Sequence, residues 1–136
     1  MDSASAFAAV ALCAVASDGV LAPQEVSALR RALEYRRPYR GMSEHQMGTL
    51  VDGLLRQLRD GGAIALVSEA AAALDHNQCL TAFALAADLI HADRSVVPQE
   101  KDYLRGLSDS LQLTREETER ILTVMDVLYR DVLGCG

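Results

Sequence analysis

Long apolar runs are missing from this 136-residue chain. Arg, Asp, Glu or His interrupts every apolar stretch before about 18 residues, the length that a membrane-spanning helix requires. The chain does not open with a charged region followed by an apolar core and a cleavage site, which is the pattern of a secretory signal. These absences predict a protein that is neither exported nor membrane-spanning.

Cysteines and basic residues are also few. Cys13, Cys79 and Cys135 are odd in number and lack the short spacings of a zinc site, so we expect reduced thiols and a cytoplasmic location. Lys and Arg total 13 against 19 Asp and Glu, which gives a formal net charge of −6. Because electrostatic binding to the phosphate backbone of a nucleic acid requires clustered cations, we expect no nucleic-acid partner.

Runs of β-branched residues are absent, whereas alanine and leucine dominate. Apolar residues recur at helical spacing, as at Leu50, Leu54 and Leu58, and never alternate with a period of two. Half of the residues are apolar, enough to bury a core. We therefore expect an all-α fold in which residues 1–136 form a single domain, one compact bundle of about seven helices. The expected helices span residues 4–17, 23–36, 44–59, 62–75, 78–92, 98–112 and 115–132.

The segment 62–75 is apolar nearly all round. Such a helix either lies buried at the centre of a domain or faces a partner. We expect this helix to be buried, because a bundle of seven helices requires a helix at its centre.

A short segment occurs twice, 75 residues apart. Residues 9–30 aligned with 84–105 are identical at Ala9, Ala11, Asp18, Pro23, Gln24, Glu25, Leu29 and Arg30. Each copy closes an apolar helix and opens the next one, which indicates an internal duplication of a helix pair.

Two interpretations of the repeated acids follow. Asp18, Glu25, Asp93 and Glu100 can form one or two sites for a hard divalent cation such as Ca²⁺, Mg²⁺ or Mn²⁺, which prefers oxygen ligands. Alternatively, Asp begins the turn, Pro opens the helix, and Glu accepts hydrogen bonds from unsatisfied backbone N–H groups. The copies do not match the EF-hand pattern of oxygen side chains.

The turn Ala16-Ser17-Asp18-Gly19-Val20, followed by Pro23-Gln24-Glu25 and by a second such turn before a terminal helix pair, resembles the TerB family of tellurite-resistance proteins and its wider TerB-like superfamily. The resemblance covers most of the chain. It implies a compact helical fold, a role in stress responses, and an acidic cluster that binds metal. Arg94 departs from the pattern, because the first copy has Gly19 there.

A basic stretch follows the first copy of the repeat. Its members are Arg30, Arg31, Arg36, Arg37 and Arg40. Arginines of this kind can dock an acidic protein, a phosphorylated peptide or lipid headgroups, so peripheral membrane association stays open. The alternative is a solvated helix end, where arginines are favoured by the helix dipole.

Catalytic motifs are missing: there is no G-x-S-x-G, no P-loop and no nucleophile with a matching base. Asp88-x-x-His91 resembles half of a di-iron motif, but the second copy is absent. We therefore expect a non-enzymatic module that binds a divalent cation and signals to a protein partner. The alternative is a metal-independent helical interaction or scaffold domain.

Overall fold

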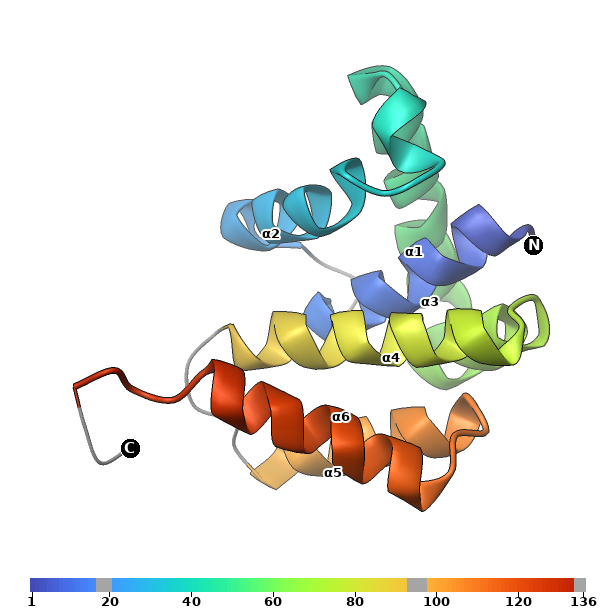
Figure 1. Ribbon diagram of the computed structural model, residues 1–136. Helices are drawn as coiled ribbons and strands as arrows, with labels where there is room; N and C mark the ends of the chain where they lie inside the picture. Colours follow the sequence, from blue (N-terminus) through green and yellow to red (C-terminus); the bar gives the residue numbers. More distant parts are fainter. Residues whose placement is uncertain (17–20, 93–97, 134–136) are drawn as a thin grey trace.

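The computed structural model describes residues 1–16, 21–92 and 98–133, and every regular element in them is helical (Figure 1). The all-α prediction is therefore confirmed. The elements are α1 (Ser3–Val15), α2 (Pro23–Glu34), the 3₁₀ turn η1 (Tyr39–Gly41), α3 (Glu44–Ala72), α4 (His76–His91), α5 (Pro98–Ser110) and α6 (Arg115–Leu128). No helix in the described ranges is both long enough and apolar enough to cross a membrane.

Helix α1 lies at the centre of the fold. It packs against α3 and α4, and α2 adds a third contact (Figure 1). Six consecutive residues of α1, from Ala8 to Cys13, are at most 1% exposed, so the middle of this helix is buried on all sides. Its alanines let neighbouring helices approach closely, because packing distance depends on the side chains at the contact.

The expectation that 62–75 forms the buried centre was wrong. In this part of the chain Leu66, Val67 and Ala70 are buried, but Ile64 is 87% exposed. The segment buries one face only, and its exposed side mixes small, polar and apolar residues. Apolar residues are common on protein surfaces as well, so composition alone did not reveal which side faces solvent.

The expected helices 44–59 and 62–75 are the two halves of α3. Gly62 separates them with φ 84° and ψ 165°, a conformation that only glycine adopts readily. The chain therefore turns at Gly62 while helical hydrogen bonding resumes beyond it, and the number of α-helices in the described ranges is six rather than seven.

Several helix starts predicted from the sequence are confirmed. Thr114 caps α6 and accepts a hydrogen bond from the Glu117 N–H at 3.1 Å, while Glu117 accepts one from the Thr114 N–H at 2.9 Å. Pro23 and Pro98 open α2 and α5, the second helices of the duplicated pairs. The first helices of the pairs, α1 and α4, pack directly on one another.

Candidate functional site

The four acids predicted to bind a cation are only partly described. Asp18 and Asp93 lie outside the described residues. Glu25 and Glu100 lie in the first turns of α2 and α5 and are half-buried. Within the described ranges, no group of three His, Cys, Asp or Glu side chains is arranged to hold a metal ion. Whether the acids converge therefore stays a prediction.

Glu25 has a defined role in the described part of the chain. Its carboxylate accepts a hydrogen bond from the Ala22 N–H at 2.8 Å. Ala22 occupies the N-cap of α2 and has no side-chain acceptor, so only the glutamate half of a capping box is present. This contact is the one expected from the helix-capping interpretation.

The five arginines of the basic stretch lie on α2, in the turn that follows it, and in η1. Arg30 lies on α2 and forms an ion pair with Glu44 at 3.6 Å. Arg31 is exposed on the same helix, and Arg40 lies in η1. Arg36 and Arg37 follow the end of α2, and these two line the same pocket.

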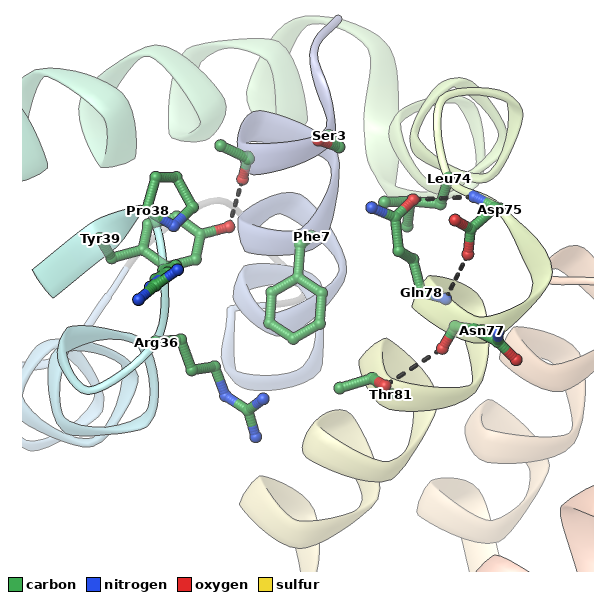
Figure 2. A pocket seen from close by; sticks show the side chains of 12 residues that line it. Ser3, Phe7, Arg36, Pro38, Tyr39, Leu74, Asp75, Asn77, Gln78 and Thr81 are labelled. Carbon is green, nitrogen blue, oxygen red and sulfur yellow. Dashed lines mark hydrogen bonds between the residues drawn. The ribbon is translucent and has the colours of Figure 1, made fainter.

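This pocket lies between α1, the turn from α2 to η1, and the start of α4 (Figure 2). Its volume is about 500 Å³, and it is open to solvent. We call it the arginine pocket and define it by six residues used below: Phe7, Arg36, Arg37, Tyr39, Asp75 and Thr81.

Arg36 is held over an aromatic ring. Its guanidinium carbon lies 5.5 Å from the centroid of Phe7, a cation–π contact, and Figure 2 shows the guanidinium directed into the pocket. No ion pair forms between either Arg36 or Arg37 and an acid within the described ranges. The pocket therefore presents two cationic side chains next to an apolar surface.

Tyr39 fixes the wall from which these arginines extend. Its hydroxyl donates a hydrogen bond to the Ala4 carbonyl of α1 at 2.5 Å, and its ring lies 6.4 Å from that of Phe7. Burial raises the pKa of Tyr39 to about 12, so the hydroxyl keeps its proton well into the alkaline range. The turn after α2 is thereby tied to the central helix.

The start of α4 forms the opposite wall. Asp75 accepts a hydrogen bond from the Gln78 N–H at 2.8 Å, and Gln78 accepts one from the Asp75 N–H at 2.9 Å. One turn later, the Thr81 hydroxyl donates to the Asn77 carbonyl at 3.1 Å. The arginine pocket thus has two positive charges on one wall and one negative charge on the other.

Arg36 and Arg37 were predicted from the sequence to contact a partner, whereas the other residues of this site were not predicted. Asp75 with Gln78 follows the capping-box pattern and would have moved the expected start of α4 from residue 78 to 76. No sequence signal marked Phe7 as a pocket residue, because its position in α1 is indistinguishable in the sequence from those of the other apolar residues of this helix.

His91 is the last residue of α4. His91 is 7% exposed, its Nδ1 lies 2.7 Å from the Ala87 carbonyl, and its Nε2 lies 3.6 Å from Asp126 of α6. Tyr129 donates a hydrogen bond to Asp88 beside it. These contacts join α4 to α6.

No protein-family model, curated protein or solved structure matches this chain. The resemblance to the TerB family therefore stays a prediction that rests on the motifs quoted above.

Proposed function

We propose that this chain is a non-enzymatic, metal-independent interaction module whose arginine pocket binds an acidic segment of another protein. The observation that carries the proposal is the pairing of Arg36 over Phe7 with a second arginine in a pocket of about 500 Å³. Guanidinium groups bind carboxylates through paired, charge-assisted hydrogen bonds.

The surroundings indicate which acidic segment fits best. Phe7, Pro38 and Leu74 add apolar surface beside the guanidinium groups. A carboxylate with an apolar side chain next to it would use both kinds of surface. The favoured ligand is therefore a peptide in which Asp or Glu alternates with apolar residues.

The same apolar surface favours a peptide over a phosphate group alone or an anionic lipid headgroup. Asp75 on the wall opposite the arginines weakens the attraction of the pocket for any anion, so the apolar contacts contribute to the choice of ligand.

The test uses fluorescence anisotropy with a fluorescein-labelled peptide of alternating glutamate and phenylalanine. We expect saturable binding that EDTA leaves unchanged. Changing both Arg36→Glu and Arg37→Glu should weaken binding at least about tenfold, because one hydrogen bond to a charged group contributes about 1.5–3 kcal/mol.

The matched control is Arg31→Glu with Arg56→Glu, which changes the net charge equally on exposed positions outside the pocket. This control should bind almost as the unaltered chain does. Equal losses in both double variants would show a general charge effect and overturn the proposal. A peptide with glutamine in place of glutamate should not bind.

Vesicles that contain phosphatidylserine and a phosphoserine version of the peptide serve as competing ligands. If either binds more tightly than the glutamate peptide, the acidic-segment proposal is wrong.

A further inference from the structure

The arginine pocket carries charges of both signs on facing walls. Among the described residues that line it, three are charged: Arg36 and Arg37 in the turn after α2, and Asp75 at the start of α4. Figure 2 shows Phe7 between the two walls, with Arg36 on one side and Asp75 on the other. The pocket therefore has an apolar centre between unlike charges.

The three charges are not neutralised by the described part of the chain. There, no ion pair joins Arg36, Arg37 or Asp75 to a group of opposite sign. Arg36 lies over the Phe7 ring at 5.5 Å, and this contact leaves the guanidinium its full charge. All three charges can therefore act on a ligand.

Helix capping occupies only part of the Asp75 carboxylate. Its Oδ1 accepts a hydrogen bond from the Gln78 N–H at 2.8 Å, as the N-cap of α4. An ionised carboxylate has about four acceptor positions on its two oxygens, so this contact leaves most of them free for a ligand. Asp75 is exposed, and a cationic group can reach it from solvent without displacing any part of the fold.

A ligand that carries only negative charge uses one wall of the pocket and is repelled by the other. A cation beside the carboxylate of the ligand changes the effect of Asp75 from repulsion to attraction. A basic side chain suits this position, because its hydrocarbon stem can lie along apolar surface while its charged end stays in water. Here the stem would cross Phe7 and the charged end would reach Asp75.

We propose that Asp75 selects a segment in which a basic residue stands near the acidic one, with the acidic side chain on Arg36 and Arg37 and the basic side chain on Asp75. This inference rests on the proposed function, because it concerns the same pocket. It adds that the bound segment carries a cation as well as a carboxylate.

A pair of fluorescein-labelled peptides measures the effect of the cation. Both alternate glutamate with phenylalanine and contain one lysine two residues from a glutamate. In the second peptide this lysine is acetylated, which removes its charge. In fluorescence anisotropy at low salt, the lysine peptide should bind the unaltered chain about two- to fivefold more tightly, the effect expected of an ion pair in contact with solvent. Added NaCl should reduce this preference.

Asp75→Asn tests the residue itself. Asparagine caps a helix about as well as aspartate does, so α4 should keep its start while this wall loses its charge. The variant should bind the two peptides with equal affinity, and it should bind the acetylated peptide at least as tightly as the unaltered chain does. A purely structural role of Asp75 would instead weaken both peptides to the same extent and leave the preference in place.

Asp60→Asn is the matched control. It removes the same charge from an exposed position of α3 outside the pocket. Because the chain has a formal net charge of −6, any peptide with an added cation gains some general attraction. The control should keep the full preference for the lysine peptide, which separates the local charge of Asp75 from this general attraction.

Three results would overturn the inference: equal affinity of the unaltered chain for the two peptides, a preference that survives Asp75→Asn, or a preference that is lost in Asp60→Asn. If the unaltered chain binds both peptides equally, the proposed function stands and only the selection by Asp75 fails. If it binds neither peptide, both proposals fail.

Discussion

The carboxylate of Glu25 accepts a hydrogen bond from the backbone N–H of Ala22, three residues earlier, at 2.8 Å. Because Ala22 cannot cap α2 with its own side chain, Glu25 supplies the side-chain contact at this helix start. Glu25, the glutamate of the first copy of the repeat, therefore has a structural role that requires no cation.

Glu25→Ala should lower the free energy of unfolding by about 1 kcal/mol, since both the capping contact and the favourable charge near the helix N-terminus are lost. Glu25→Gln keeps the acceptor oxygen and should lose less. Urea denaturation measures both. Glu69→Ala, at an exposed position of α3, should stay within about 0.5 kcal/mol. Equal effects at Glu25 and Glu69 would contradict the capping role.

The sequence also predicts a cation-responsive module of the stress-response type, and this prediction has its own test. A cation that binds the folded chain adds about 2.7 kcal/mol of stability at a hundredfold excess over its Kd. If Asp18 and Asp93 are ligands, Ca²⁺, Mg²⁺ or Mn²⁺ should raise the thermal midpoint of EDTA-treated protein. The rise should disappear in Asp18→Asn and Asp93→Asn. An unchanged midpoint with every cation would leave the acids as helix caps.

Replacing either of two neighbouring glycines in α3 by alanine should change the stability of the fold in opposite directions. Gly62 has φ 84°, so Gly62→Ala should destabilise by about 1–2 kcal/mol. Gly61 lies in the helix, and a Cβ added there meets only the Ala65 Cβ at 3.9 Å. Gly61→Ala should therefore stabilise by about 0.5–1 kcal/mol. Thermal denaturation of both variants checks the expected difference in sign, and a matching sign would show that α3 does not turn at Gly62.

Cys13 should be unreactive in the folded chain. Burial raises the pKa of its thiol from 9.0 to about 11, which lowers the thiolate fraction at pH 8 about a hundredfold, besides blocking access. Mass spectrometry after iodoacetamide treatment should find Cys13 unmodified until urea unfolds the chain. Rapid modification without urea would contradict the central position of α1.

The same shift predicts a loss of stability at alkaline pH. The folded-state pKa of Cys13 lies above its unfolded value. The protonated thiol therefore makes its full contribution to the free energy of unfolding below pH 9, and this contribution is lost as pH rises from 9 to about 11. Burial raises the pKa of Tyr39 to about 12, so the loss of stability continues to higher pH as this group ionises. Urea midpoints measured between pH 7 and pH 11 should fall through this range. Urea midpoints that stay constant from pH 7 to pH 11 would contradict this prediction.

Leu12 tests the centre of the core directly. It is fully buried in α1, so Leu12→Ala should destabilise by about 2.7–5 kcal/mol. Leu128→Ala, which truncates a side chain that is 61% exposed, should change stability by no more than about 0.5 kcal/mol. Urea denaturation of both variants makes the comparison.

Local features of the fold were predictable because they depend on neighbouring residues. The starts of α2, α5 and α6 lie at the expected residues 23, 98 and 115, and a proline opens each of the first two. Ends were less certain: α6 ends at Leu128, four residues before the expected position, because the apolar pattern continues through Val132 without a stop signal.

The candidate site was predictable only in part. Arg36 and Arg37 were recognised as cations that could face a partner, but the different neighbours of Arg30 and Arg36 were not recognised. Arg30 lies on α2 and pairs with Glu44 of α3, whereas Arg36 follows the end of α2 and lies over Phe7 of α1. A stretch of basic residues near the end of a helix gives no information about which neighbours those residues meet.

The sequence by itself determined the all-α class, most helix starts and the duplicated helix pair, since hydrogen bonding and capping act within a few residues. The tertiary structure decided that α1 rather than 62–75 forms the centre, and that Phe7, Arg36 and Asp75 border one pocket. These outcomes depend on how closely helices distant in sequence can pack, and that depends on side-chain shape across the whole core.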